Sequence, residues 1–390
     1  MKNKYFEWIN NNLLNTWYNT IITIFVSFFL FEITKSMILW FTSVSWEVIP
    51  RNLKLILTGS YPVGELWRIW VILGVAAFLA GVSYSLLKKG ITGTALFLII
   101  IPGSFAFLNF SSGSRIWLII LSILQIFGYL FARYIAGEKS KTVIIIGWVL
   151  FLPFMYLFIS GFTSSEGILP IVKTNYWGGL LLSMLISITS IIFSFIIGLM
   201  LALGRRSELP VIKYFSIGVI ETIRGVPLIT LLFLGYLVLP LALPSSVTPG
   251  VLIRAMSGII LFHSAYMAES IRGGFQGLPK TQYEAAYAMN FNKFQSLVLI
   301  ILPQVIKNII PILVNSLTGM VKDTSLISII GLLDLVGIST AIAANPKYLG
   351  DSPQVLLFLS VIYFILCFSI SQTSRKIEAG MNYDNKEAAK

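Results

Sequence analysis

The charged residues that could do chemistry in this chain lie in its second half, within or beside apolar stretches. Glu221 and Arg224 stand three residues apart in ETIRGVP, and Glu269 and Arg272 repeat that spacing in ESIRGG. Residues three apart share one face of a helix, and charges within lipid are costly unless they pair or face water. We interpret Glu221–Arg224 as a structural ion pair near the membrane interface, with contact to a solute path as the alternative. We interpret Glu269–Arg272 as a structural pair.

A second polar group is the run Lys322-Asp323-Thr324-Ser325, which follows an apolar stretch. A cation beside an anion, with broken helices after them, could bind both ends of a zwitterionic solute. The alternative is a mutual salt bridge between Lys322 and Asp323 that holds a re-entrant bend. The single histidine, His263, could face the same path, but we favour the interpretation of a packed, neutral histidine that is hydrogen-bonded to a neighbouring helix.

Several kinds of chemistry are excluded by what the chain lacks. One histidine cannot build a multi-histidine metal site, and the lone Cys367 cannot form an internal disulfide. The phosphate-binding pattern GxxxxGK[ST] is absent, so any ATP must bind to another chain. The net charge of +12 comes from scattered basic residues rather than a basic face, which argues against nucleic-acid binding. We therefore predict no catalytic residues, no metal and no cofactor bound by this chain.

The longest predicted cytoplasmic loop carries the pattern of a short helix. Pro279 suits the start of a helix, and Thr281 with Glu284 three residues on predicts a capping box. Asn290 tolerates the left-handed conformation at which such a helix ends. A short exposed helix of this kind can dock to a cytoplasmic partner, and the alternative is an amphipathic helix that lies on the bilayer.

Small and aromatic side chains alternate on this predicted helix. Ala285 and Ala286 would let another surface approach closely, while Tyr283 and Tyr287 stand one turn apart and can supply aromatic contact. The composition of the helix therefore favours protein docking.

The elements that position these residues are transmembrane helices. The chain has 390 residues, of which 56% are hydrophobic and only 11% are charged, against about 25% charged in a soluble domain. At about 20 residues per span, this length could hold about ten helices and no large soluble domain. We predict an all-α polytopic membrane protein of about ten transmembrane helices. The apolar runs lie at about 16–44, 66–87, 91–110, 115–136, 141–162, 176–204, 212–243, 251–271, 295–319 and 355–373.

Two of these apolar stretches are irregular. The first is interrupted by Glu32 and Lys35 and lacks a small-residue cleavage site, so we expect a retained helix rather than a signal peptide. The stretch 324–345 is broken by Gly331, Asp334 and Gly337 and predicts short broken helices that line a cavity.

The distribution of basic residues predicts the orientation of the chain. If all ten runs span and the N-terminus is cytoplasmic, seventeen Lys and Arg lie on inside segments and nine on outside segments. This bias follows the positive-inside rule and places both termini in the cytoplasm.

The sequence EAAYAMNFNKFQSLVLIILP resembles the EAA loop of ABC-transporter permeases. Glu284-Ala285-Ala286, Ile300, Leu302 and Pro303 stand at the family's spacings, and Asn290 replaces the usual glycine. Flanking motifs such as WGGLLLSMLIS, IETIRGVPLITLLF and LPQVIKNIIPILVNSLTGMVKDTSLISIIGL narrow the resemblance to polar amino-acid permeases over residues 175–376. The long N-terminal extension makes the chain similar to a permease subunit of a general L-amino-acid transport system.

The resemblance implies a five-helix core of a type I ABC importer within a longer chain. The implied parts are residues 1–170 with about five additional helices, residues 171–376 with the cytoplasmic loop 272–295, and a polar cytoplasmic tail at 377–390. It also implies that the loop helix docks in a cleft of a separate ATPase, which binds ATP and Mg²⁺, and that this chain is not an enzyme. The resemblance implies Glu284, Ala285, Ala286 and Asn290 in coupling, and we add Lys280, Tyr283 and Tyr287 of the same helix to this prediction.

The resemblance further implies a bacterial inner-membrane protein that carries L-amino acids and works with other chains. The partners are ABC ATPase subunits, an extracytoplasmic amino-acid-binding protein and a second permease, for which the resemblance favours a different chain over an identical copy. The alternatives are an ion-gradient-driven secondary transporter and a non-transporting membrane scaffold. The candidate residues of the substrate path are Glu221, Arg224, His263, Lys322, Asp323, Thr324 and Ser325.

Overall fold

The computed structural model describes residues 2–85, 112–136, 140–163, 167–244, 246–247 and 249–388. Within these ranges the regular secondary structure is helical, and β-structure is confined to two isolated bridges. The all-α prediction is therefore confirmed. The first half contains α1 (Lys2–Asn12), α2 (Trp17–Ser43), α3 (Val48–Thr58), α4 (Leu66–Ser85), α6 (Ser112–Leu130) with the π-helical turn η2 (Phe131–Ala136), and α7 (Ser140–Ser160).

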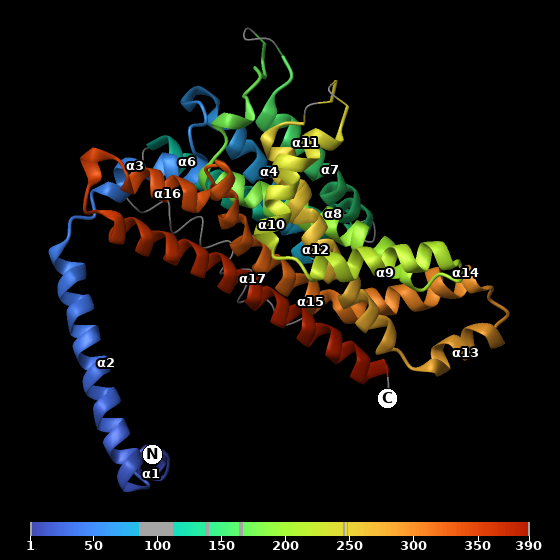
Figure 1. The fold of residues 1–390 in the computed structure, drawn as a ribbon, viewed down its shortest axis with the longest axis horizontal. Helices are drawn as coiled ribbons and strands as arrows, with labels where there is room; N and C mark the ends of the chain where they lie inside the picture. Colours follow the sequence, from blue (N-terminus) through green and yellow to red (C-terminus); the bar gives the residue numbers. More distant parts are fainter. Residues whose placement is uncertain are drawn as a thin grey trace.

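The second half forms a bundle with one helix projecting from its end (Figure 1). It contains α8 (Gly179–Arg205), α9 (Pro210–Arg224), α10 (Leu228–Phe233), η5 (Leu234–Val238), α11 (Leu239–Ala242), α12 (Val251–Gln276), α13 (Lys280–Ala288), α14 (Lys293–Gln295), η6 (Ser296–Ile301), α15 (Leu302–Asp323), η7 (Thr324–Ile330), α16 (Leu335–Ala343) and α17 (Ser352–Ala388).

The described helices include eight that are long and apolar enough to cross a membrane, and nine if one bent pair counts as a span. Eight of the ten predicted runs match these eight helices. The run predicted at 91–110 lies outside the described residues. The multi-pass membrane architecture is confirmed for the rest of the chain.

The run predicted at 212–243 is not one straight helix. It consists of Pro210–Arg224 and Leu228–Ala242, whose axes differ by 111°. The physical reason is the sequence RGVP: Pro227 has no backbone N–H to donate and disfavours the helical conformation in the residue before it. The predicted run is therefore a bent pair of helices and not one continuous helix, and Arg224 ends a helix instead of lying inside one.

The N-terminal helices and the second half share one hydrophobic core. Tyr61 and Phe151 from the first half pack in the same cluster as Leu182, Ile259 and Met320 from the second. The predicted domain boundary near residue 170 stays a prediction, because residues from both sides of it pack in one cluster.

Glycines bring α3 against the start of α8. A Cβ on Gly59 would lie 2.5 Å from the Cα of Gly178, and one on Gly179 would lie 2.1 Å from the carbonyl oxygen of Ile56. Both Gly59 and Gly179 also have positive φ values, 63° and 59°, which disfavour any other residue. The sequence WGG therefore fixes the approach of the first half to the second.

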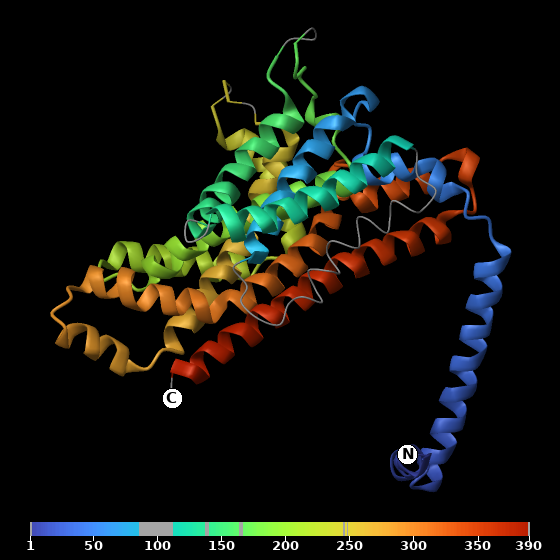
Figure 2. The ribbon, with the colours of Figure 1, turned by 180° about the vertical axis from the view of Figure 1, so that it is seen from behind.

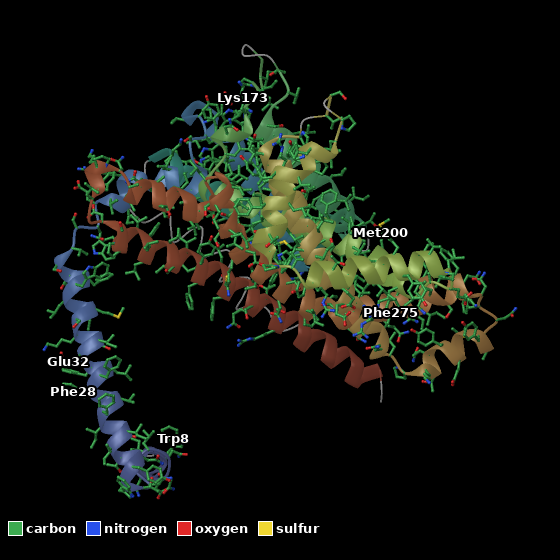
Figure 3. The ribbon with its side chains drawn as sticks, viewed as in Figure 1. Trp8, Phe28, Glu32, Lys173, Met200 and Phe275 are labelled. Carbon is green, nitrogen blue, oxygen red and sulfur yellow. The ribbon has the colours of Figure 1, made fainter. Side chains whose placement is uncertain are left out.

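The first transmembrane helix, α2, stands apart from the bundle in both views (Figures 1 and 2). None of its residues is buried within this chain. Glu32 lies on its exposed surface (Figure 3) and pairs with Lys35 at 3.9 Å, with both side chains about half exposed. The two charges in the first apolar run therefore partner each other.

The segment after α15 confirms the prediction of short broken helices. A 3₁₀ helix, η7, ends at Gly331 with a positive φ of 85°, and Asp334 then caps α16 by accepting from the backbone N–H of Gly337 at 2.9 Å. Asp334 is fully buried, and burial raises its pKa to about 6 although the two backbone donors of α16 oppose that rise. The predicted cavity beside these helices stays a prediction.

Candidate coupling loop and solute path

The loop helix α13 projects at one end of the bundle, between α12 and α14 (Figure 1). It begins at Lys280 after Pro279, and no side chain caps it. The predicted capping box of Thr281 and Glu284 is wrong, because Pro279 takes the N-cap position and Thr281 falls inside the first turn. Asn290 adopts φ = 63° directly after the helix, which confirms its predicted left-handed conformation.

The capping box lies at the next helix instead. Asn292 accepts from the backbone N–H of Gln295 at 2.8 Å, and Gln295 accepts from the backbone N–H of Asn292 at 3.1 Å. The pattern N-x-x-Q satisfies the same two donors as the S/T-x-x-E pattern, so this box was readable from the sequence.

The inner face of α13 is held by the chain itself. Ala286 is only 1% exposed, and Tyr283 packs against the cluster formed by α8, α12 and α15. The Tyr283 hydroxyl accepts from Arg206 Nη2 at 3.3 Å, and the Arg206 guanidinium lies 4.4 Å from the ring centroid of Phe275. Gln304 Nε2 donates to Gln282 Oε1 at 3.1 Å. Ala286 and Tyr283, predicted to contact a partner, thus face this chain's own helices.

The outer face of α13 carries the remaining predicted residues. We use this name for the exposed set Lys280, Glu284, Ala285, Tyr287, Ala288, Met289 and Asn290. Tyr287 is 53% exposed and Met289 is 69% exposed, so large apolar side chains border the small Ala285 and Ala288. A surface of this composition suits protein contact.

A surface ion pair ties the loop to the start of α9. Lys293 donates to Glu208, and this hydrogen bond holds the pKa of the Glu208 carboxyl below its usual range. Both side chains are exposed, so the pair adds little stability. It nevertheless joins the C-terminal end of the loop region, at Lys293, to the turn at residues 205–209.

Five charged residues meet where α8, α9 and α12 end, and we call them the ionic joint. They are Arg205, Glu221, Arg224, Glu269 and Arg272. Glu221 lies 3.0 Å from Arg205 Nη1 and 3.6 Å from Arg224 Nη1. Glu269 lies 3.5 Å from Arg205 and 3.8 Å from Arg224, and it also binds Arg272. Both predicted i, i+3 ion pairs are therefore confirmed within a larger network.

The spacing of residues along the chain does not predict that Arg205 belongs to this network. It is 16 residues from Glu221 and 64 from Glu269, beyond any local spacing rule. Its position as the last residue of α8 is the one available signal, because a charge at the end of a span needs a partner nearby.

His263 and Asp323 come together from α12 and α15. His263 Nε2 lies 3.2 Å from Asp323 Oδ2, and the histidine is 8% exposed. His263 thus packs against a neighbouring helix, as one interpretation expected. The alternative of a Lys322–Asp323 salt bridge is wrong, because Asp323 lies beside His263, without a hydrogen bond to its Nε2, and among the described residues it forms no ion pair with the exposed Lys322.

The other members of the polar run have different environments. Thr324 is fully buried and its hydroxyl donates to the carbonyl of Val321 at 2.8 Å, whereas Ser325 is half-buried. Glu269 lies six positions after His263 on α12, which is about 9 Å along the helix axis. The seven predicted path residues therefore form two groups, one around Asp323 and one at the ionic joint.

These features define a multi-pass membrane protein with a projecting, partly exposed helix and no nucleotide-binding loop in its sequence. A family model described as "Binding-protein-dependent transport system inner membrane component" matches residues 194–382. The chain is 32% identical to the inner membrane amino-acid ABC transporter permease protein YhdY of Escherichia coli, covering 96% of this chain and 92% of that protein. The chain belongs to this family of ABC-transporter permeases, which are non-catalytic inner-membrane subunits.

Two further proteins are similar to the chain. The chain is 36% identical to the glutamate/glutamine/aspartate/asparagine transport system permease protein BztC of Rhodobacter capsulatus, over 88% of this chain and 80% of that protein. A solved structure, "Crystal structure of an amino acid ABC transporter with histidines", is similar with a TM-score of 0.46 and 28% identity, covering 50% of this chain and 89% of that chain.

Proposed function

We propose that this chain forms the membrane path for L-amino acids in an importer driven by ATP, which binds with Mg²⁺ to a separate ATPase subunit. Membership of the permease family and the amino-acid substrates in the relatives' names support this substrate class. The family membership does not favour a secondary transporter or a passive scaffold. An extracytoplasmic binding protein delivers the amino acid, a second and different permease completes the path, and both termini lie in the cytoplasm.

The observation that carries the proposal is the outer face of α13, which is exposed while the inner face is fixed. Arg206, Tyr283 and Gln282 hold the helix to the ends of α8 and α15. A helix held in this way moves as a rigid body with the bundle instead of flexing as a loop. The ATPase therefore docks at Ala285 and its neighbours, and its closure pulls on α8, α12 and α15.

The helices that receive this motion are tightly packed against each other. A Cβ on Gly198 of α8 would lie 2.7 Å from Met267 Cβ of α12, and Ser194 donates to the carbonyl of Ile260 at 3.1 Å. Small residues at such a contact let two transmembrane helices approach closely and move together. Motion of α12 displaces His263 relative to Asp323 on α15.

The two polar groups then have different roles along the path. We assign Asp323 with His263, Lys322, Thr324 and Ser325 to contact with the charged groups of the amino acid inside the membrane. The ionic joint, including Glu221 and Arg224, holds the helix ends at the cytoplasmic side and separates when the path opens inward.

Site-directed photocrosslinking tests the docking assignment. The chain has one cysteine, so Cys367→Ser gives a cysteine-free background in a single step. Ala288→Cys on the outer face of α13, labelled with a benzophenone maleimide, is expected to crosslink to the ATPase subunit of the assembled transporter. The matched control is Ala344→Cys, an exposed alanine just after α16 at the opposite end of the bundle (Figure 1). Equal ATPase adducts from both positions, or none from position 288, would contradict the assignment.

A further inference from the structure

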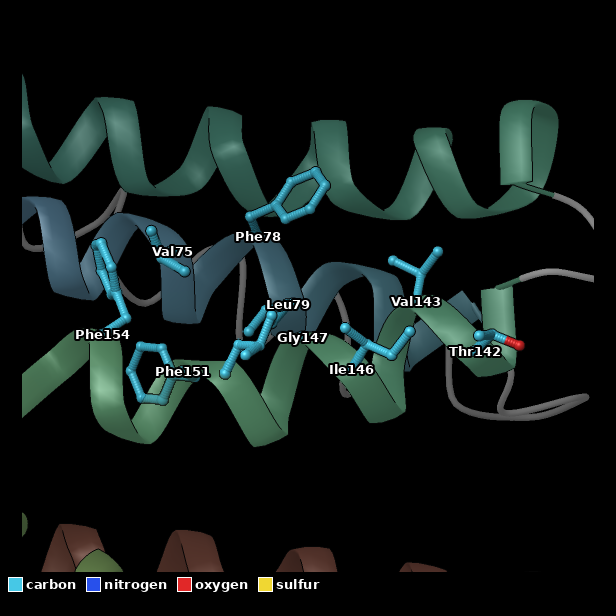
Figure 4. Close-up of a pocket in the computed structure, with 10 residues that line it drawn as sticks. Val75, Phe78, Leu79, Thr142, Val143, Ile146, Gly147, Phe151 and Phe154 are labelled. Carbon is cyan, nitrogen blue, oxygen red and sulfur yellow. The ribbon is translucent and has the colours of Figure 1, made fainter.

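An apolar groove runs along the contact between α4 and α7, outside the residues 194–382 that match the permease family model. Its volume is about 800 Å³, and its walls are apolar except at one end, where Thr142 lies (Figure 4). The side chains that define it are Val75, Phe78, Leu79, Ile146, Phe151 and Phe154. All of them belong to helices long and apolar enough to span the membrane, so the groove opens within the bilayer.

The length of the groove indicates what fills it. Thr142 and Phe154 mark its ends on α7, and twelve residues at 1.5 Å per residue span about 18 Å. One leaflet of the hydrocarbon core is about 15 Å thick, half of about 30 Å. A second transmembrane helix would need a contact of twice that length. A single acyl chain of a phospholipid matches the groove.

Basic residues lie at the Thr142 end. Lys141 precedes Thr142 and is exposed, and Arg133 is exposed on η2, which contacts both α4 and α7. Arg133 Nη1 donates to the hydroxyl of Tyr129 at 3.0 Å, which orients the guanidinium at this end of the helices. The phosphate of a lipid bound in the groove would lie at this end, where the acyl chain joins the headgroup. Two cations there complement the negative charge of that phosphate.

We propose that this groove binds an anionic phospholipid, with one acyl chain between α4 and α7 and the phosphate beside Lys141 and Arg133. On the orientation proposed above, the lipid comes from the cytoplasmic leaflet. The bound chain fills the space between two helices of the N-terminal part and so supports the packing of that part in the membrane.

Photolabelling of the full transporter in lipid nanodiscs tests this site. The probe is phosphatidylglycerol with a diazirine in one acyl chain, diluted into phosphatidylcholine. The label is expected on peptides of α4 and α7, and Ile146→Trp is expected to remove it by filling the groove. Ile145→Trp is the matched control, because Ile145 is 66% exposed and does not line the groove. Equal labelling of the two variants would overturn the acyl-chain site.

The headgroup is tested separately in the same nanodiscs. Lys141→Gln and Arg133→Gln are each expected to lower labelling by phosphatidylglycerol, relative to a matching phosphatidylcholine probe, by about fivefold, because each basic residue near the surface contributes about 1 kcal/mol. Arg115→Gln, an exposed arginine near the start of α6, is the control and should change nothing. An unchanged lipid preference in both test variants would overturn the anionic specificity.

Discussion

Replacing Ala285 by tryptophan is expected to abolish amino-acid-stimulated ATP hydrolysis in the reconstituted transporter. Ala285 lies on the outer face of α13, where its small side chain allows a partner to approach the helix backbone. An indole there would hold the ATPase away from the helix. Loss of a central interface contact costs at least about 2 kcal/mol, which weakens docking by about 30-fold. The measurement is the rate of phosphate release with and without binding protein and amino acid.

The control for this prediction is Ala285→Ser, which keeps the residue small and exposed. It should retain stimulated hydrolysis at close to the wild-type rate. Because Ala285 is exposed, neither substitution should change the thermal stability of the chain. Normal coupling in the tryptophan variant would show that the ATPase does not dock on this face.

Replacing Glu269 by glutamine is expected to cause the second largest loss, in both stability and transport. Glu269 faces Arg205, Arg224 and Arg272, and its side chain is 24% exposed. Its removal leaves three guanidinium groups with Glu221 as their one carboxylate in the ionic joint. The expected cost is about 1–3 kcal/mol, between the values for exposed and for buried ion pairs. Thermal unfolding in detergent measures the stability, and uptake in vesicles measures transport.

A surface ion pair supplies the matched control for Glu269. Glu47 pairs with Arg51, with side chains 61% and 48% exposed, so Glu47→Gln should change the free energy of unfolding by less than about 1 kcal/mol. Adding Arg272→Gln to Glu269→Gln removes one unpaired cation and should restore part of the lost stability. If Glu269→Gln behaves like Glu47→Gln, the ionic joint does not hold the helix ends together.

The sequence was sufficient for the features that depend on local spacing. Hydrophobic runs gave the positions of eight described transmembrane helices, and the i, i+3 spacing gave the Glu221–Arg224 and Glu269–Arg272 pairs. The left-handed conformation of Asn290 also followed from its residue type and position. These features are set by interactions within one helix or one turn.

Features that depend on contacts between distant segments could not be predicted from the sequence. Arg205 contacts Glu269, which is 64 residues away in the sequence. Asp323 lies beside His263 of another helix, whereas its sequence neighbour Lys322 is exposed. Ala286 and Ala285 are adjacent and identical in type, yet one is buried and one is exposed because one side of α13 packs against η6 and the neighbouring cluster. Which residues are in contact and which are buried depends on how the helices pack. The bend at Pro227 is different, because it could have been predicted from the sequence RGVP. The continuous hydrophobicity of the run led us to predict one helix instead.

The energy source of uptake tests the central claim most directly. Proteoliposomes that contain this chain, its ATPase, the second permease and the binding protein are supplied with a labelled L-amino acid, and ATP is given on the side of α13. We predict accumulation that requires ATP and continues when an uncoupler removes all ion gradients. Accumulation without ATP that the uncoupler abolishes would contradict the account and show a transporter driven by an ion gradient.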